Sequence, residues 1–166
     1  MGKNKRSNIW DINISKQNIF VTKNPDETRN LGERFASVLR SSDIVFLNGD
    51  LGSGKTIFAQ GVIKAFGNKG FAKSSSFIIV NEYNAGDLKL FHFDLYRLEP
   101  SNILDIGIEE YIYSKNISLI EWADRLIGSF NDSYWNVEIE DMGSIRKIKI
   151  EKKYENFSCR NFRKNV

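Results

Sequence analysis

The alternation of apolar and polar residues divides the first third of the chain into two strands and a helix. Short apolar runs at residues 18–22 and 43–47 predict the strands. Between them, apolar residues recur every three or four positions over residues 25–40, which predicts a helix with one buried face. Asn24 suits the N-cap of that helix, and Glu27 stands where it can complete a capping box.

The middle of the chain predicts a second helix and a hairpin. Over residues 57–66 the apolar positions form a single stripe, and Gly67 follows as a natural helix stop. The next two runs, 77–83 and 88–95, are both strand-like. Residues 84–87 join them, and a connection of that length predicts an antiparallel pair.

The last third of the chain mixes short helices with strands. Residues 102–113 predict short helical pieces, 117–122 a strand, and 123–129 one or two helical turns. The runs 134–140 and 145–151 both alternate and are separated by a turn, so we predict a second hairpin. No internal repeat or long linker divides the chain, and the elements together predict a mixed sheet with helices on its faces.

Length and charge indicate one domain with basic ends. The 166 residues, 41% hydrophobic and 27% charged, are enough for one buried core. We assign residues 1–151 to a single domain, with 1–8 as a basic N-terminal extension and 152–166 as a basic C-terminal tail. Aromatic residues stand between the tail's basic residues, so the tail could contact tRNA or an acidic partner; the simpler interpretation is a solvated tail.

The sequence predicts a cytoplasmic protein that does not enter a membrane. Its apolar runs are far too short to cross a bilayer, and its first residues are polar and basic, unlike a signal peptide. The chain has a single cysteine, Cys159, which cannot form an intramolecular disulfide and fits a reducing compartment.

The strongest chemical signal is the glycine-rich segment between the strand at 43–47 and the helix at 57–66. It fits the P-loop pattern, in which a glycine and four variable residues precede Gly-Lys-Thr. Glycines let the backbone N–H groups converge on a β-phosphate, the lysine follows the β- and γ-phosphates, and the threonine hydroxyl is a ligand for Mg²⁺. The predicted nucleotide-binding residues are Gly49, Asp50, Leu51, Gly52, Ser53, Gly54, Lys55 and Thr56.

This motif predicts both the ligand and the fold class. We expect ATP with Mg²⁺, and ATP rather than GTP, because no Asn/Thr-Lys-x-Asp element of guanine specificity follows the loop. The strand–loop–helix order is the structural context of a P-loop. We therefore predict an α/β fold: a P-loop NTPase-like three-layer sandwich with a mixed β-sheet and antiparallel edge hairpins.

Two acidic residues at strand ends are candidates to complete the site. Asp94 and Glu121 each end an apolar run, and in an open α/β sheet such positions face the ligand crevice. The alternative is that each is a solvated strand-end carboxylate. Arg97 could reach phosphate charge, although a surface ion pair is the simpler interpretation. His92 is the only histidine, and we interpret it as a packed, hydrogen-bonded side chain.

The combination of motifs resembles the TsaE (formerly YjeE) family of bacterial tRNA threonylcarbamoyladenosine biosynthesis ATPases. The resemblance runs from about Asn24 to Arg125 and includes the glycine loop. The other matching segments are Asn24-x-x-Glu27-Thr28, Ser74-Ser75-Ser76-Phe77, Val80-Asn81-Glu82-Tyr83, His92-x-Asp94-x-Tyr96-Arg97 and Glu121-Trp122.

The resemblance implies a role for individual residues. Thr56 and Glu121 would hold Mg²⁺, and Asp94 would occupy a Walker-B-like position that supports hydrolysis. Ser76 would be a switch-like hydroxyl near the γ-phosphate, and Thr28 would lie near the base. The implied catalytic residues are Lys55, Asp94, Glu121 and Ser76.

The resemblance also implies partners. Family members act with TsaD and TsaB, and ATP hydrolysis resets or regulates that complex rather than transferring the threonylcarbamoyl group. Activity without the partners is therefore expected to be weak. Ser75, Ile57 and Ala123 depart from the family pattern, which bears on the rate more than on the reaction.

Three other functions remain open from the sequence. A small-molecule kinase could use the same loop, although no arginine-rich stretch that could form a lid follows it. A binding module could use ATP as a switch without useful turnover. A direct nucleic-acid binder is supported only by the basic ends of the chain.

Overall fold

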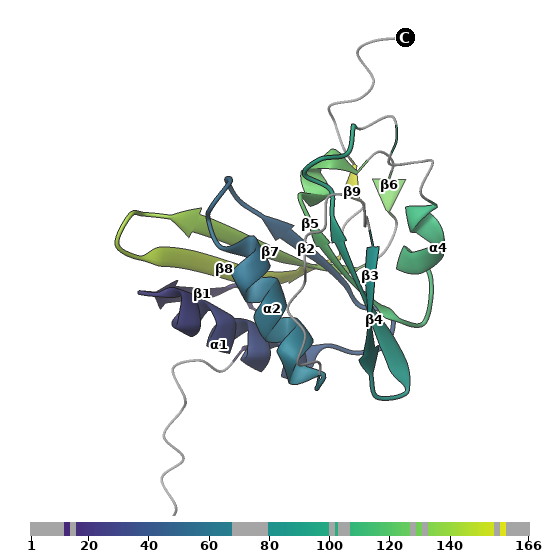
Figure 1. The fold of residues 1–166 in the computed structure, drawn as a ribbon, viewed down its shortest axis with the longest axis horizontal. Coiled ribbons are helices and arrows are strands. Elements are labelled where there is room, and N and C mark those ends of the chain that lie inside the picture. Colours follow the sequence, from purple (N-terminus) through teal and green to yellow (C-terminus); the bar gives the residue numbers. More distant parts are fainter. Residues whose placement is uncertain are drawn as a thin grey trace, which may run out of the picture.

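A seven-stranded mixed sheet forms the centre of the protein (Figure 1). The computed structural model describes residues 12–13, 16–67, 80–99, 102, 107–126, 129–130, 133–154 and 157–158. The strands lie in the order β1-β8-β7-β2-β5-β4-β3. Their bounds are β1 (Asn18–Thr22), β2 (Ile44–Asn48), β3 (Val80–Ala85), β4 (Leu88–Asp94), β5 (Ile117–Glu121), β7 (Tyr134–Asp141) and β8 (Arg146–Lys153).

The centre of this sheet is parallel and both of its sides are antiparallel. β2 pairs in parallel with β5 and with β7, and β4 pairs in parallel with β5. The hairpins β3–β4 and β7–β8 flank this centre, which confirms both predicted hairpins. β1 adds antiparallel to β8, so on that side the edge strand is β1 and not the hairpin.

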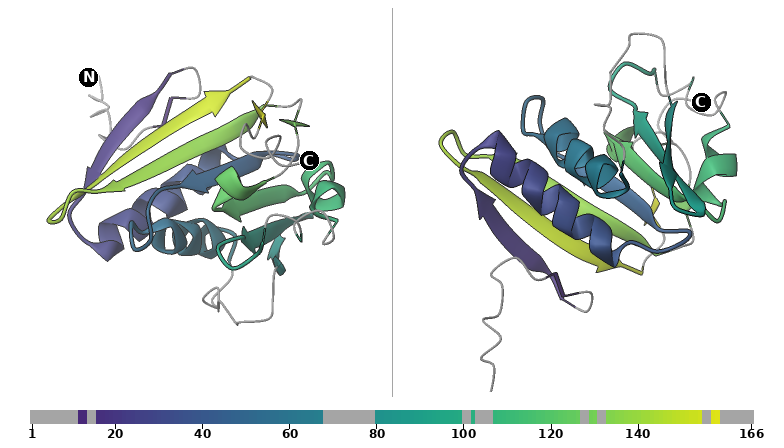
Figure 2. Two further views of the ribbon diagram at one scale, coloured as in Figure 1. Left: turned by 90° about the horizontal axis from the view of Figure 1, so that it is seen from above. Right: turned by 60° about the horizontal axis from the view of Figure 1, so that its bottom comes forward.

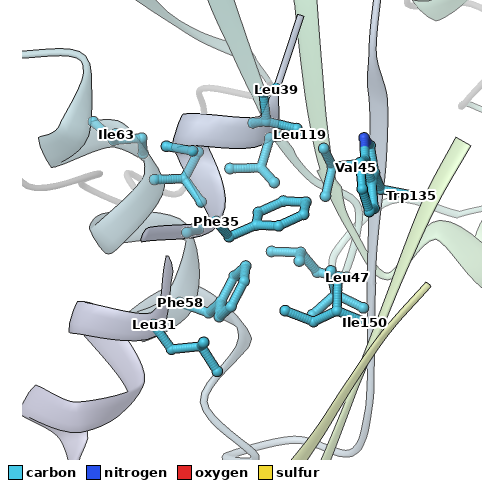
Figure 3. Packing of buried hydrophobic residues seen from close by; sticks show 14 of the residues in the cluster. Leu31, Phe35, Leu39, Val45, Leu47, Phe58, Ile63, Leu119, Trp135 and Ile150 are labelled. Carbon is cyan, nitrogen blue, oxygen red and sulfur yellow. The ribbon is translucent and has the colours of Figure 1, made fainter. Parts of the chain in front are cut away.

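Two long helices cover one face of the sheet. They are α1 (Pro25–Phe35), which continues as the 3₁₀ turn η1 (Ala36–Val38), and α2 (Lys55–Ala65). They lie side by side across β7, β8 and β2 (Figure 2). The Phe35 ring is at the centre of the core beneath them, 5.3 Å from the Trp135 ring and 5.6 Å from the Phe58 ring (Figure 3).

Shorter elements cover the opposite face. There α4 (Ile108–Ile112) and the 3₁₀ turn η3 (Ala123–Arg125) pack on a second apolar cluster. Side chains alternate along β2, so Val45 packs in the core beneath α1 and α2, whereas Phe46 packs in this second cluster. The fold is therefore the predicted three-layer α/β sandwich. A separate two-stranded sheet pairs β6 (Ser129–Phe130) with β9 (Phe157–Ser158).

The predicted helices exist, with shifted ends. The Asn24 side chain caps α1 by accepting from the Glu27 N–H at 2.9 Å, as predicted. The Glu27 carboxylate accepts from the Lys23 N–H instead of the Asn24 N–H, so the capping box is displaced by one residue. The α-helical part of 25–40 ends at Phe35, and α2 begins at Lys55 instead of residue 57.

Elements near the C-terminus also differ from the prediction. Of the helical turn expected over 123–129, the described part is η3, and residue 129 begins β6; residues 127–128 lie outside the described residues. β8 continues through Lys152 and Lys153, two residues that we had counted in the tail. Residues 77–79 of the predicted strand 77–83 lie outside the described residues. Within the part of the chain that the structure describes, no helix is long and apolar enough to cross a membrane.

Two glycines allow α1 and α2 to approach closely. A methyl carbon built on Gly32 would lie 2.2 Å from the Phe58 carbonyl oxygen, and one on Gly61 would lie 2.0 Å from the Arg29 carbonyl oxygen. Both distances are far below van der Waals contact, and both obstacles are backbone atoms. The close packing of α1 against α2, the helix that follows the glycine loop, therefore requires glycine at these two positions.

We predict that Gly32→Ala and Gly61→Ala each lower the free energy of unfolding by at least about 2 kcal/mol, because the backbones must separate. Helix propensity alone would give a gain of about 1 kcal/mol. Urea unfolding followed by circular dichroism measures the difference. Asn30→Ala, at an exposed position of α1, is the control and should change stability by a few tenths of a kcal/mol. Stability gained in either glycine variant would contradict the close packing.

Candidate functional site

The glycine loop connects the end of β2 to the start of α2 along a path that requires glycine. Gly49, Gly52 and Gly54 have φ angles of 142°, 82° and 111°, which L side chains rarely adopt. Gly49 also meets a steric limit, because a methyl carbon there would lie 2.2 Å from the Ile139 carbonyl oxygen of β7. The loop is thus fixed by the sheet on one side and open on the other.

The N-terminus of α2 is free to bind an anion. Gly54 occupies the cap position, and it has no side chain to hydrogen-bond the first N–H groups of the helix. These N–H groups and the positive end of the helix dipole favour a negatively charged group such as phosphate. The helix start thereby has the arrangement that the P-loop motif predicts.

Lys55 lies inside the loop and is held by the loop's own carbonyl groups. Its Nζ donates to the carbonyl oxygens of Gly49 at 2.7 Å and Asp50 at 2.8 Å. The same nitrogen lies 3.8 Å from the centre of the Trp122 ring. Burial lowers the pKa of Lys55, while the carboxylates of Glu121 and Asp94 act in the opposite direction. The cation is therefore poorly solvated and close to the place where phosphates would bind.

Thr56, Glu121 and His92 form a continuous line of hydrogen bonds. The Thr56 hydroxyl donates to Oε2 of Glu121 at 2.8 Å, and Oε1 of Glu121 lies 2.9 Å from Nε2 of His92. Glu121 is 1% exposed and His92 is 3% exposed. The resemblance implied that Thr56 and Glu121 act together, and the interpretation of His92 as a packed, hydrogen-bonded side chain is confirmed.

Lys55, Thr56 and Glu121 line a pocket of about 220 Å³ at the carboxyl ends of the parallel strands. Its walls are Leu51, Gly52, Gly54, Lys55, Thr56, Ile57, Asp94, Tyr96, Glu121 and Trp122. Both predicted acids therefore face the pocket that the glycine loop forms. Asp94 ends β4, and its Oδ1 accepts from the Tyr96 N–H at 3.1 Å.

The pocket suits a metal ion that arrives with its ligand. Among the described residues, no group of three or more His, Cys, Asp or Glu side chains could hold a metal ion by itself. Thr56 and Glu121 supply oxygen donors 2.8 Å apart, with Asp94 on the same wall. Mg²⁺ keeps several waters and binds through one or two carboxylates plus phosphate oxygens, so this donor set fits it.

Aromatic residues close one side of the pocket, a role that was not predicted for them from the sequence. Trp122 has a φ of 60° and lies 4.9 Å from the Tyr96 ring. Arg125 contacts both rings and donates to carbonyl oxygens of the segment after β4, including that of Leu98 at 3.2 Å. The sequence could have indicated Trp122, because it directly follows Glu121, and a residue next to a strand-end acid lies at the same edge of the sheet.

Other residues take positions outside the pocket. Thr28 is fully buried, its hydroxyl 2.8 Å from that of Thr22, and its methyl group lies beneath Gly54. Its contact with a nucleotide base stays a prediction. Arg97 is exposed and forms no ion pair with a described residue, and it does not line the pocket. Ser76 and Ser75 lie outside the described residues.

Arg146 is a contact of the loop that no sequence signal indicated. It begins β8, and its Nε donates to the Ser53 carbonyl oxygen at 3.0 Å. Ninety-three residues separate the two positions, so only the β1–β8–β7 arrangement brings them together. Of the two described departures from the family pattern, Ile57 lines the pocket and Ala123 is the buried first residue of η3.

Comparisons with known proteins agree with this geometry. The family model described as "Threonylcarbamoyl adenosine biosynthesis protein TsaE" matches residues 22–149. The chain is 39% identical over 108 residues to the tRNA threonylcarbamoyladenosine biosynthesis protein TsaE of Bacillus subtilis, covering 65% of this chain and 68% of that protein. It is 36% identical over 134 residues to the Haemophilus influenzae protein of the same name, covering 76% and 85%.

A solved structure resembles the fold as a whole. The crystal structure of Bacillus subtilis YdiB matches with a TM-score of 0.66 and 30% sequence identity. The match covers 87% of this chain and 90% of that one. The similarity therefore extends over most of the chain.

The loop geometry generates a prediction with an internal control. Gly49→Ala and Gly52→Ala both place a side chain at a positive φ, which destabilises by about 1–2 kcal/mol. Only Gly49→Ala also clashes with a backbone atom, whereas a methyl group on Gly52 meets no atom of the described residues within 4 Å. We expect Gly49→Ala to lose at least about 1 kcal/mol more stability in urea unfolding of the nucleotide-free protein. Equal losses would mean that β7 does not support the loop.

Proposed function

The chain belongs to the TsaE family of threonylcarbamoyl adenosine biosynthesis proteins, and from this membership and the pocket we propose that it binds ATP with Mg²⁺ and hydrolyses it. The reaction serves the tRNA N6-threonylcarbamoyladenosine modification machinery of the cytoplasm. The protein acts with TsaD and TsaB, and its ATP hydrolysis resets or regulates their complex instead of transferring the group.

One observation supports the proposal above all others. The glycine loop brings an ammonium group and a hydroxyl to the start of α2, in the same pocket as the carboxylates of Asp94 and Glu121. Lys55 and the helix N-terminus suit a polyphosphate, and the acids suit the metal and the water that hydrolysis requires. A site for a neutral ligand would not need this pairing of charges.

Each residue has a defined task in the proposed reaction. Lys55 exchanges its carbonyl acceptors on Gly49 and Asp50 for charged phosphate oxygens, which form stronger hydrogen bonds. Thr56 and Glu121 would hold Mg²⁺, which would neutralise charge on the phosphates. Asp94 orients the attacking water from the end of β4.

Two further roles rest on the resemblance alone. Ser76, outside the described residues, is proposed as a switch-like hydroxyl near the γ-phosphate. Thr28, beneath Gly54, is proposed to lie near the base. The basic tail, residues 152–166, is proposed to contact tRNA, which salt-sensitive binding would reveal.

The direct test measures phosphate release from ATP in Mg²⁺, with and without TsaD and TsaB. We expect slow release by the protein alone and faster release when both partners are present. Transfer of phosphate to a small-molecule acceptor, in place of water, would identify a kinase. Stable ATP binding without partner-stimulated release would identify a nucleotide-dependent binding module.

We predict that Lys55→Ala lowers ATP affinity by at least about 100-fold, because the charged hydrogen bonds to phosphate contribute about 3 kcal/mol or more in total. Isothermal titration calorimetry measures the change. Lys64→Ala is the matched control, since it removes an exposed lysine from the same helix at a position paired with Glu33. Unchanged ATP affinity in Lys55→Ala would exclude the loop as the phosphate site.

We predict that Glu121→Ala and Glu121→Gln lower Mg²⁺-dependent turnover by about 100-fold, because a metal ligand supports several kcal/mol of charge stabilisation. ATP affinity in EDTA should change by no more than about threefold, an amount below 1 kcal/mol. Phosphate release and calorimetry measure the two effects. Glu110→Ala, at an exposed position of α4, is the control. Turnover that survives both Glu121 variants would show that the metal assignment is wrong.

A further inference from the structure

We propose that His92 is a positioning residue that fixes the Glu121 carboxylate for Mg²⁺, an inference that rests on the proposed ATP site. The sequence predicted a packed, hydrogen-bonded histidine, and the burial of the ring and its hydrogen bond confirm that prediction. What the structure adds is the partner, because the bond goes to Glu121, the proposed metal ligand.

Strand register places His92 and Glu121 on the same face of the sheet. β4 and β5 are parallel, with His92 opposite Leu119 and Asp94 opposite Glu121. Side chains alternate along a strand, so His92 and Asp94 point toward α2 while Phe91 and Phe93 point into the second apolar cluster. The imidazole therefore lies behind the two acids, one layer deeper than the pocket.

The two oxygens of Glu121 are held by different partners. Oε2 accepts from Thr56, the residue that would share the metal, and Oε1 is 2.9 Å from His92 Nε2. A carboxylate oxygen accepts hydrogen bonds, so Nε2 is the nitrogen that donates. With both oxygens fixed, the carboxylate cannot rotate away from Thr56. Hydrogen bonds of this kind orient metal ligands, and their loss typically lowers metal affinity 10- to 100-fold.

The second ring nitrogen of His92, Nδ1, distinguishes the proposed positioning role from simple packing. Nδ1 of His92 is buried and has no hydrogen-bond partner among the described residues. A buried polar atom without a partner destabilises the folded state, and a leucine at this position would avoid that loss. Within the described part of the chain, the imidazole therefore makes one hydrogen bond, and that bond goes to the proposed metal ligand.

The experiment titrates Mg²⁺ into the complex of the protein with ADP, and measures ADP affinity in EDTA separately. His92→Leu removes the donor; His92→Gln places an amide N–H at nearly the position of Nε2, and His92→Asn places an amide too far back to reach Glu121. Ser118→Ala is the control for a general loss of packing, since Ser118 is buried on β5 and bonds to Tyr111 away from the pocket.

We expect His92→Leu and His92→Asn to bind Mg²⁺ about 10- to 100-fold more weakly in the ADP complex, with ADP affinity in EDTA within about twofold of the original protein. His92→Gln should restore most of the Mg²⁺ affinity, and Ser118→Ala should leave it unchanged. If His92→Leu does not fold, the difference between the asparagine and glutamine variants decides.

Two results would overturn the inference. One is a Mg²⁺ affinity in the leucine or asparagine variant equal to that of the original protein. The other is an equal loss in the glutamine and asparagine variants. Failure of the proposed function is distinguishable, because the original protein would then bind no ADP in either buffer.

Discussion

The parallel pairing of β2, β5 and β4 is the constraint on which the rest of the site depends. Because parallel strands end at the same edge of a sheet, Leu47 lies opposite Glu121, and Glu121 opposite Asp94. The glycine loop leaves that edge directly after β2 and turns into α2 above the same carboxylates. Hydrogen bonds from Thr56 and His92 then fix the central carboxylate.

This edge concentrates charge in a poorly solvated place. The Lys55 ammonium is bonded to backbone carbonyls and covered by Trp122, and burial lowers its pKa. The nearby carboxylates favour the charged form of Lys55, and the N–H groups at the start of α2 favour an anion. A polyphosphate with a divalent cation would satisfy both the positive and the negative groups together. The same pocket would bind either component alone less well.

Local sequence signals predicted the parts of the site that lie close together in the chain. The Gly49–Thr56 segment between a strand and a helix was sufficient to predict the loop. Asp94 and Glu121 were identified because acids at strand ends of an open α/β sheet face the ligand crevice. Contacts between distant segments left no comparable signal. Arg146 reaches Ser53 only because β1 and β8 extend the sheet, and no periodicity specifies that order. His92 was predicted to be packed and hydrogen-bonded, which the structure confirms, but a strand pattern does not show that its partner is the Glu121 carboxylate.

The central claim is that the glycine loop and the two acids bind a nucleoside triphosphate together with Mg²⁺. Calorimetric titration of ATP into the folded protein, in buffer with Mg²⁺ and again in EDTA, tests it most directly. We predict saturable binding of one ATP per chain that is tighter with Mg²⁺ than without it. The absence of binding heat in the Mg²⁺ buffer at several temperatures would contradict the claim.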